Sequence, residues 1–476
     1  MTTLAIELND ASIAVARSDD RIATARSDGR IATARSDGLI ATEMGCAIET
    51  GDGIAFGDAA LRSSRLRPRD ANDRYWADLG VGPLARPISR AKSTADLAHA
   101  QLLQLWKQFG EATDEVLLAV PGSFHREKLG LLLGIANACE MPVTGLVDTA
   151  VAACRCPYPG WDSIHVEAYL HGFGITRIGL SQRGGVDEAI AEAFETVNRI
   201  GVAQLRERWA RRIAAAFVVQ TRFDPLSDGK TEQRLFDALP GWLEAFGNLP
   251  SATVEFDVGQ ATKSIQLASK DLVAEAADVY DHLADRVAAA RRTGRGLAVR
   301  VGSVLAGLPG ATERLAKIAG VRVVELPAGA GALGALACAK DIRSGPGKTA
   351  LVKSLGWRAP AGRLPALRPD ELDDSVSEAT HLLIRDTAHP IGEGDLNLRF
   401  GEAGRLQVIA ESGDDRTDFA LRHSEGGLQL EYAGDVGVLV NAKPAESGTR
   451  LQSGDRIAVS GSTEEAQLIT VSSDGP

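Results

Sequence analysis

Residues 119–153 read AVPGSFHREKLGLLLGIANACEMPVTGLVDTAVAA, and this stretch decides the fold. The apolar run at 115–120 predicts a strand that ends at Pro121, because proline lacks the N–H that would continue a strand ladder. Residues 126–140 place leucines and alanines at helical spacing, and 143–153 predict a short strand and the start of another helix. Strands that alternate with helices of this length are typical of an α/β protein.

The same alternation continues to residue 342. The segments concerned are expected strands at 165–170 (HVEAYL), 175–180 (ITRIGL), 297–301 (LAVRV) and 321–326 (VRVVEL), and expected helices at 311–320 and 331–342. We therefore expect an α/β body over residues 1–342, with mixed sheets and helices on their faces.

The pattern changes after residue 342. Residues 343–371 hold four prolines, several glycines and little periodicity, so we interpret them as a linker. The GPGKT motif at 345–349 is part of a P-loop pattern, but Ile342 stands where the first glycine is required and a helix is expected before it. From 372 to 476, short alternating runs separated by Gly, Asp and Ser turns predict an all-β sandwich of about eight strands.

Charge is unevenly distributed along the chain. Residues 1–360 carry 42 Lys and Arg against 42 Asp and Glu, whereas 361–476 carry 10 against 21, so the excess of 11 negative charges lies in the last quarter. Binding to nucleic acid or to an anionic membrane needs clustered Lys and Arg, so we expect neither. An acidic sandwich instead predicts a protein partner that contacts this C-terminal region.

The cysteine content and the N-terminal sequence indicate the cellular compartment in which the protein is expected. The five cysteines are few, and the 154/156 spacing is neither a redox nor a zinc pair, so we interpret them as reduced packing residues. The first ten residues, MTTLAIELND, include a carboxylate where a signal peptide would be basic, and no run approaches eighteen apolar residues. We expect a cytoplasmic protein.

A nine-residue tandem repeat occupies residues 16–42, as ARSDDRIAT, ARSDGRIAT and ARSDGLIAT. Each copy reads as an extended segment and a turn, and removing two copies leaves an ordinary hairpin. The repeat therefore lengthens one hairpin at a sheet edge, or it presents an arginine-rich ribbon to an acidic partner.

Five motifs, in order, resemble the nucleotidase domain shared by actin, sugar kinases and the seventy-kilodalton heat-shock chaperones, and most closely the chaperones. The motifs are LAIELNDASIAV (4–15), the stretch 119–153, HVEAYLHGFGITRIGL (165–180), VRVGSVLAGLPG (299–310) and PAGAGALGALACA (327–339). The resemblance implies two ribonuclease-H-like lobes, at about 1–150 and 151–342, with ATP or ADP and magnesium in the cleft between them.

Carried over position by position, the resemblance marks a degenerate nucleotide cleft. Its candidate residues are Glu7, Asn9, Asp10, Ala11, Asp148, Gly172, Gly174, Gly302, Ser303, Gly329 and Gly331. The family holds phosphate with backbone N–H groups at glycine-rich hairpin tips, because glycine permits close approach. Here the first tip has Asn9, Asp10 and Ala11 in place of Gly-Thr-Thr.

Other replacements affect the metal and the second hairpin. Glu7 and Asp148 stand where the family orients magnesium with Asp and Glu, and Tyr169 replaces the Asp of the second hairpin, with Glu167 two residues before it. His171 and Phe173 flank the retained Gly172, and we expect them, with Asp10, to crowd the cleft.

The charge of Asp10 bears directly on the affinity for a triphosphate. A like charge ~4 Å from a phosphate costs about 4 kcal/mol at an effective dielectric near 20. Hydrolysis also needs a positioned metal and an oriented water, and no residue matches the phosphate-contacting lysine of the family. We therefore expect at most weak binding of ATP or ADP with magnesium, very weak or no hydrolysis, no catalytic residue and no dedicated metal ligand.

The nucleoside half of the site is better preserved. Gly302, Ser303, Gly329, Gly331 and Gly334 keep the small-residue lining where the family binds adenosine. Alternatively, these glycines serve only to let helices pack on strands.

The tail resembles the forkhead-associated domain in its set Leu451, Gly454, Asp455 and Ile457. The phosphothreonine-reading residues of that family are not matched: Glu393 follows Gly392 where arginine is expected, and Ala442 follows Asn441 where glycine is expected. Phosphopeptide reading is therefore not expected.

Two functions from different classes fit these observations. The first is a degenerate heat-shock-70-like protein that acts as a non-catalytic or weakly nucleotide-binding scaffold or sensor, with the sandwich as its protein-interaction module. The alternative is an active ATP-dependent chaperone or assembly ATPase whose sandwich binds client peptides. Loss of the hairpin glycines favours the first.

Overall fold

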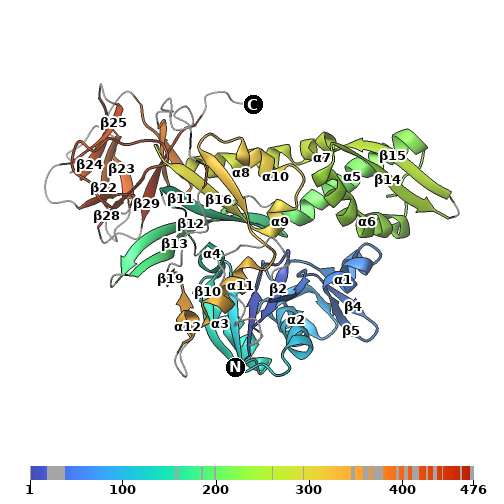
Figure 1. Cartoon of the computed structure of the whole chain (residues 1–476). Coiled ribbons are helices and arrows are strands. Elements are labelled where there is room, and N and C mark those ends of the chain that lie inside the picture. The colour runs from blue at the N-terminus through green and yellow to red at the C-terminus, as the bar shows by residue number, and fades with distance from the viewer. Residues whose placement is uncertain are drawn as a thin grey trace.

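The computed structural model describes most of the chain. The described residues are 2–18, 38–154, 156, 158, 160–183, 186–197, 200–259, 261–292, 294–344, 349–356, 364, 365, 367, 379–392, 396–400, 406–409, 418–424, 427–432, 437–441, 443–460 and 464–471. They form a mixed α/β body followed by a β-rich C-terminal region (Figure 1), as the alternation of periodicities predicts.

Two six-stranded sheets organise the body. The first has the order β18-β10-β9-β1-β2-β3, from β1 (Thr3–Glu7), β2 (Ile13–Arg17), β3 (Leu39–Glu43), β9 (Glu115–Val120), β10 (Val143–Asp148) and β18 (Leu351–Val352). The second has the order β17-β16-β11-β12-β13-β19, from β11 (Trp161–Tyr169), β12 (Gly172–Arg183), β13 (Val186–Val197), β16 (Gly296–Val301), β17 (Val321–Glu325) and β19 (Ser354–Gly356).

The two sheets share one pairing pattern. In the first, β10, β9 and β1 are parallel and β1, β2 and β3 are antiparallel. In the second, β17, β16 and β11 are parallel and β11, β12 and β13 are antiparallel. Each sheet therefore begins with a hairpin whose first strand is central, so the turns after β1 and β11 occupy equivalent places.

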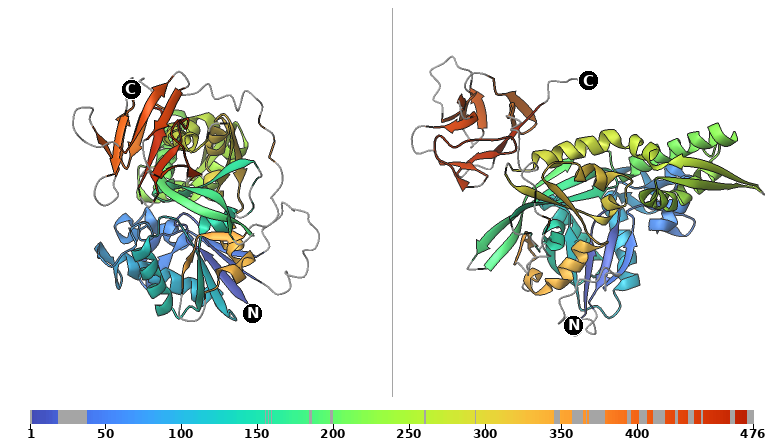
Figure 2. Two further views of the ribbon diagram at one scale, coloured as in Figure 1. Left: turned by 90° about the vertical axis from the view of Figure 1, so that its left-hand side faces the viewer. Right: turned by 45° about the horizontal axis from the view of Figure 1, so that its top comes forward.

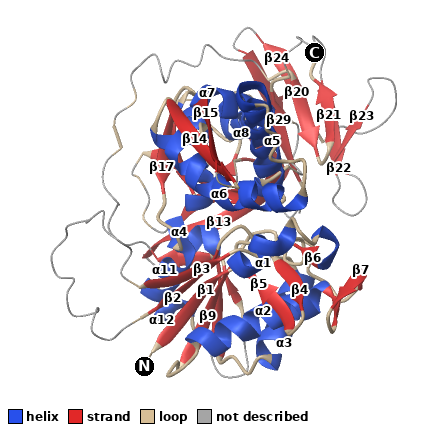
Figure 3. Ribbon diagram, turned by 90° about the vertical axis from the view of Figure 1, so that its right-hand side faces the viewer, coloured by secondary structure: helices blue, strands red, loops and turns tan. Residues whose placement is uncertain are grey.

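Helices cover both faces of each sheet (Figure 3). α2 (Thr94–Phe109) and α3 (Arg126–Ala138) pack on one face of the first sheet through alternate side chains such as Leu4 and Ile6. The opposite face, with Ala5, packs on α4 (Thr149–Cys154) and α11 (Ala330–Ala337), which lie between the two sheets. The alternation follows from the period of two in a strand.

The contact between α4 and α11 is too close for larger residues. A Cβ on Gly334 would lie 2.0 Å from the carbonyl oxygen of Ala152, and one on Gly331 would lie 2.7 Å from Cγ2 of Thr149. Glycine at these two positions therefore allows α4 and α11 to approach each other closely.

The remaining body elements extend the two halves. The first sheet is joined by β4 (Ala47–Thr50), β5 (Gly53–Phe56), α1 (Gly57–Ser64), the 3-10 turn Pro68–Asp70, β6 (Ala71–Asn72), β7 (Pro83–Ile88) and β8 (Ala91–Ser93). The second is joined by α5 (Val202–Thr221), α6 (Gly229–Asn248), β14 (Ser251–Val258), β15 (Ala261–Ala268), α7 (Ser269–Glu275), α8 (Ala277–Ala289), α9 (Ser303–Ala306) and α10 (Ala311–Ala316). The β14–β15 hairpin with α5 and α6 projects away from the sandwich (Figure 1).

Local sequence explains where helices begin. The Ser93 side chain accepts a hydrogen bond from the Asp96 backbone N–H, and Asp96 in return accepts one from the Ser93 N–H, so a capping box starts α2. Helix ends are less well predicted: α3 stops at Ala138, two residues early, and α10 stops at Ala316. The expected helix at 331–342 is broken at Cys338 into α11 and α12 (Ala339–Ile342).

The expected linker begins later than its composition indicates. Residues 351–356 form β18 and β19, which add a parallel strand to β10 of the first sheet and an antiparallel strand to β13 of the second. We call residues 351–356 the strap, because they pair with both sheets. Residues 345–348, which include most of the GPGKT motif, and residues 19–37 of the tandem repeat lie outside the described residues. The strands that flank the repeat pair as expected, β2 with β3.

The C-terminal region is a sandwich of two sheets that share one core (Figure 2). Its described strands are β20 (His381–Ile384), β21 (Thr387–Pro390), β22 (Leu396–Phe400), β23 (Leu406–Ile409), β24 (Phe419–Ser424), β25 (Gly427–Glu431), β26 (Val438–Val440), β27 (Lys443–Pro444), β28 (Arg456–Val459) and β29 (Glu465–Ile469). They are two more than expected, because β21 and β27 carry no alternating apolar run.

The motif residues of the tail have structural roles. Leu451 and Ile457 are buried in the sandwich core, and Asp455 accepts hydrogen bonds from the Asn441 side chain and the Gln452 N–H. Gly454 has φ +92° and lies against α8 of the body, where a Cβ would be 2.8 Å from the carbonyl oxygen of Arg291. Glu393 and Ala442 lie outside the described residues.

Candidate functional site

The tips of the β1–β2 and β11–β12 hairpins are bound directly to each other. The Asn9 side chain donates from Nδ2 to the Ala168 carbonyl oxygen at 3.1 Å, and Asp10 Oδ1 accepts from the Leu170 N–H at 2.8 Å. Asn9 Oδ1 also accepts from the Ala11 N–H at 2.9 Å, which fixes the first turn. We call the two bonds between the hairpins, from Asn9 and Asp10, the hairpin latch.

Burial makes the latch hard to open. Asn9 and Asp10 are buried, so breaking the latch would leave unpaired polar groups in the interior. Burial raises the pKa of Asp10 to about 6, although the hydrogen bond from Leu170 and the nearby His171 lower it. The turn that the resemblance assigns to phosphate is therefore occupied by protein groups of this chain.

His171 lies near Asp10, and its side chain contacts two further elements. Its Nε2 lies 3.1 Å from the Asp73 carbonyl oxygen and 3.3 Å from Oδ1 of Asp73, and its Nδ1 lies 3.1 Å from Nε2 of Gln204. Burial alone would lower the pKa of His171, but the hydrogen bond and charge of Asp73 raise it overall. Phe173 is fully buried in the core of the second sheet, so the expectation that it crowds the cleft is wrong.

The two acidic residues at the expected metal positions cap helices. Glu7 Oε2 accepts hydrogen bonds from the N–H groups of Gly331 (2.8 Å) and Ala332 (3.1 Å) at the start of α11. Asp148 Oδ1 accepts from the N–H of Ala150 (2.9 Å) in α4. Carboxylates are favourable at helix N-termini, so both side chains have a structural partner. Among the described residues, no group of three or more His, Cys, Asp or Glu side chains could hold a metal ion.

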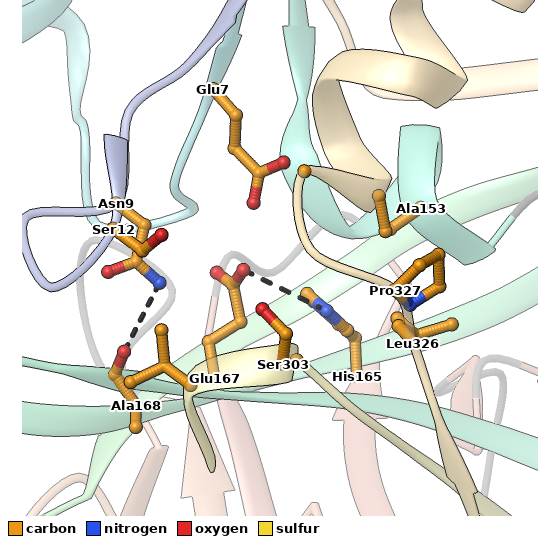
Figure 4. A pocket seen from close by; sticks show the side chains of 14 residues that line it. Glu7, Asn9, Ser12, Ala153, His165, Glu167, Ala168, Ser303, Leu326 and Pro327 are labelled. Atoms are coloured by element: carbon orange, nitrogen blue, oxygen red, sulfur yellow. Dashed lines mark hydrogen bonds and ion pairs between the residues drawn. The ribbon is translucent and has the colours of Figure 1, made fainter. Parts of the chain in front are cut away.

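A small cavity remains between the sheets, and Figure 4 shows Glu7 and Glu167 facing one another across it. Water-sized spheres can occupy about 20 Å³ there, which is room for about one water molecule. The Tyr169 hydroxyl donates to Glu167 at 2.8 Å, and His165 Nε2 lies 3.9 Å from Glu167 Oε1. A nucleotide polyphosphate does not fit in this space.

The paired carboxylates favour protonation. Burial raises the pKa of Glu7, and the charge of Glu167 raises it further. Burial likewise raises the pKa of Glu167. Burial lowers the pKa of His165 to about 4, so at neutral pH this imidazole is uncharged and does not neutralise the pair. Two buried like charges repel, so the arrangement favours a proton on at least one of the two carboxyl groups.

A larger cavity lies next to the small one, on the side of α6, α9 and α10. Its volume is about 530 Å³, and Ser12, Ser303 and Val304 line both cavities. Three carboxylates and one guanidinium line the larger one: Glu244, Glu313, Glu325 and Arg206. The volume suits a nucleoside, whereas the surplus of negative charge opposes a phosphate group.

Figure 4 labels three of the candidate residues that gather around the small cavity, and the complete set of candidates there is Glu7, Asn9, Gly302, Ser303 and Gly329. Ala11 lines the larger cavity, and Asp10 and Gly172 line a separate pocket beside Lys128 and His171. Gly331 packs on Glu7 and Asp148 caps α4. Gly174 lies under the Phe194 and Tyr169 rings, where a Cβ would be 2.8 Å and 2.9 Å from ring carbons, so it has a packing role.

Lys128 lies beside the candidate site and is not among the residues that the sequence predicts there. It lies in α3 and lines the pocket beside Asp10, and its Nζ donates to the Ala77 carbonyl oxygen at 2.7 Å. Burial lowers its pKa, which the charges of Asp78 and Asp10 partly offset. The sequence signal that could have identified Lys128 is its position in the first turn of a helix that follows a central strand.

No family model matches this chain, and a search of curated proteins found no match. Among the described residues, no helix has the length and apolar character needed to span a bilayer.

Proposed function

We propose that the body is a two-lobed nucleotidase fold of the actin and heat-shock-70 class in which the hairpin latch has replaced phosphate binding, and that the protein works as a scaffold or nucleoside sensor. The repeated strand order and pairing of the two sheets support the fold. In this proposal the first sheet and its helices form one lobe, the second sheet and its helices form the other, and the turns after β1 and β11 face each other across the cleft.

The single observation that carries the proposal is the hairpin latch. Asp10 and Asn9 use their side chains to bind the opposite hairpin, so the Leu170 N–H is not available to a phosphate unless a buried hydrogen bond is broken. Each such bond contributes about 1 kcal/mol net, and leaving its buried partner unsatisfied costs about 1–3 kcal/mol. Phosphate would also meet the Asp10 carboxylate, with a repulsion of about 4 kcal/mol if it came within 4 Å.

The larger cavity determines which ligand the protein can bind in this proposal. Its volume admits a nucleoside beside Ser303, and its three carboxylates disfavour the phosphates of a nucleotide. Adenosine should therefore bind at least as well as magnesium-ATP. The sandwich, which carries most of the excess negative charge, then offers the surface for a protein partner with basic residues.

Titration calorimetry with adenosine, ADP and ATP, each with and without magnesium, tests the proposal. We expect no advantage for the triphosphate and no release of phosphate over hours. Replacing the latch residues together, Asn9→Gly with Asp10→Thr, should raise the affinity for magnesium-ATP at least tenfold. Asp52→Thr, on an exposed turn, is the matched control and should leave the affinity unchanged.

Two results would overturn the proposal. Micromolar binding of magnesium-ATP with turnover by the unaltered protein would favour the alternative, an ATP-driven chaperone or assembly ATPase. An unchanged ATP affinity in a folded latch variant would show that the latch is not what excludes phosphate.

A further inference from the structure

A further cavity, remote from the hairpins, lies where the sandwich meets the body. Its volume is about 90 Å³, and residues of β11, β12, β13 and α8 line it together with residues of β28 and β29 of the sandwich. In Figure 1 the sandwich lies beside the ends of β11, β16 and α8. The cavity is thus shared by two parts of the chain that are far apart in sequence.

Three arginines line this cavity, and their partners leave a surplus of positive charge. Arg286 of α8 is paired with Glu195 at 2.5 Å, and Arg456 of β28 is paired with the half-exposed Glu465 at 3.2 Å. Arg177 of β12 makes no ion pair with a described residue. Among the described residues that line the cavity, Glu195 is the only carboxylate, against three arginines. The charges of Glu192 and Asp162 also act on Arg177 and partly offset the two arginines that lower its pKa.

The burial of Arg177 is the observation that most strongly indicates a ligand in this cavity. It is 8% exposed, and its guanidinium donates to the Ala290 carbonyl oxygen at 2.7 Å. The Nε atoms of Arg177 and Arg456 are buried and have no hydrogen-bond partner among the described residues. A buried guanidinium with unsatisfied donors costs several kcal/mol unless an acceptor compensates it.

The arginines also oppose docking of the sandwich unless an anion lies between them. Arg177 belongs to the body and Arg456 to the sandwich, and after burial the charge of Arg456 is the largest influence that lowers the pKa of Arg177 to about 10. The sandwich is nevertheless held there by two other contacts: Gln467 donates to the Ala289 carbonyl oxygen at 3.2 Å, and Gly454 packs on the end of α8.

We propose that this interface is a binding site for a tetrahedral oxyanion, either inorganic phosphate or the phosphate group of a small phosphomonoester, held by Arg177 and Arg456. Guanidinium groups bind phosphate oxygens through paired N–H donors, and the cavity has room for such a group. Because one arginine comes from each side, the anion stabilises the docked sandwich, and docking in turn raises the affinity for the anion.

The site is independent of the nucleoside proposal, and its test uses the full chain freed of phosphate by dialysis. Calorimetry with sodium phosphate and with glycerol phosphate, at constant ionic strength in chloride, should give saturable binding. If glycerol phosphate binds and inorganic phosphate does not, a phosphomonoester is the ligand; the reverse result assigns free phosphate. Small-angle scattering should show a smaller radius of gyration once the anion is added.

Variants decide whether these arginines are responsible. Arg456→Gln should weaken anion binding about tenfold or more, the fold-change expected for loss of a charge-assisted hydrogen bond. Arg177→Gln should do the same, and if it fails to fold, Arg177→Lys replaces it, because lysine keeps the charge but loses the paired N–H donors of the guanidinium. Arg314→Gln, which removes an exposed ion pair with Asp281 elsewhere on the body, is the matched control and should bind normally.

The proposal is overturned if phosphate and its ester have no effect beyond that of chloride. It is also overturned if folded Arg456→Gln and Arg177→Gln variants, or Arg177→Lys in place of the latter, bind the anion as tightly as the Arg314→Gln control. Thermal unfolding of each variant without anion establishes that it is folded.

Discussion

Asp10 and Leu170 are 160 residues apart in the chain, and Oδ1 of Asp10 accepts a 2.8 Å hydrogen bond from the Leu170 backbone N–H. This bond joins the first hairpin of one sheet to the equivalent hairpin of the other. The Asp10 carboxylate holds the two turns together and also repels an anionic ligand from the same place. The one side chain therefore stabilises the contact between the hairpins and selects against anions.

The stability of the protein should fall as pH rises through the titration of Asp10. Burial raises its pKa from 3.8 to about 6, so between these values the folded state binds more protons than the unfolded state. The stabilisation by protonation is complete below about pH 4 and is lost by about pH 6, on the order of 3 kcal/mol. Asp10→Asn should flatten this part of the profile in thermal unfolding. The exposed Asp52→Asn should not. Glu7 and Glu167, whose pKa values are also raised, leave a remaining fall in every variant, so a profile as steep in Asp10→Asn as in the unaltered protein would contradict the assignment.

Two substitutions at Glu7 should have opposite effects. Glu7→Gln keeps an oxygen for the N–H groups of Gly331 and Ala332 but removes a charge beside Glu167, so it should stabilise the protein above neutral pH and change little near pH 4. Glu7→Ala removes the cap of α11 and should cost about 1–2 kcal/mol or more. Chemical denaturation at pH 4 and pH 8 measures both; equal behaviour of the two variants would show that the cap is unimportant.

Gly334→Ala should destabilise the body strongly. The new methyl group would lie 2.0 Å from the Ala152 carbonyl oxygen, so α4 and α11 must separate, and overpacking of this kind costs about 1–3 kcal/mol. Gly134→Ala is the matched control, because that helical glycine faces open space and alanine there should stabilise by about 0.4–1 kcal/mol. A folded Gly334→Ala protein of unchanged stability would mean that the two helices do not cross this closely.

Trp209 offers an optical probe of the larger cavity. It lines that cavity, is fully buried, and donates from its indole N–H to the Leu272 carbonyl oxygen at 2.9 Å. Adenosine should therefore change the intrinsic fluorescence, and Trp209→Phe should abolish that change. Trp161→Phe, at the far end of β11, should retain it. The loss of the indole bond should cost Trp209→Phe about 1–3 kcal/mol of stability.

The sequence predicts the architecture well where periodicity is strong. Strands β9, β16 and β17 and helix α3 follow from apolar spacing alone, and the turn residues Asn9 and Asp10 stand out as polar residues at a hairpin tip. The burial of Phe173 is a consequence of strand alternation, since the residue after Gly172 faces the core of the second sheet.

Other features depend on partners that no local pattern reveals. The bonds from Asn9 to Ala168 and from Asp10 to Leu170 exist because two sheets meet, and nothing near residue 10 indicates which N–H its carboxylate will bind. The strap at 351–356 has no periodicity and follows a glycine-rich segment, so its strands are created by pairing with β10 and β13 rather than by propensity.

The strap has a mechanical consequence. Its six residues connect, through one chain segment, the edge of the first sheet, the edge of the second sheet and the path that leads to the sandwich. The two sheets and the sandwich are therefore linked one after another through this segment. A motion that separates the two sheets would have to break the pairing of β18 with β10 or of β19 with β13. A force applied along the chain from the C-terminal region reaches β19 before β18. The pairing of β19 with the second sheet is therefore loaded first.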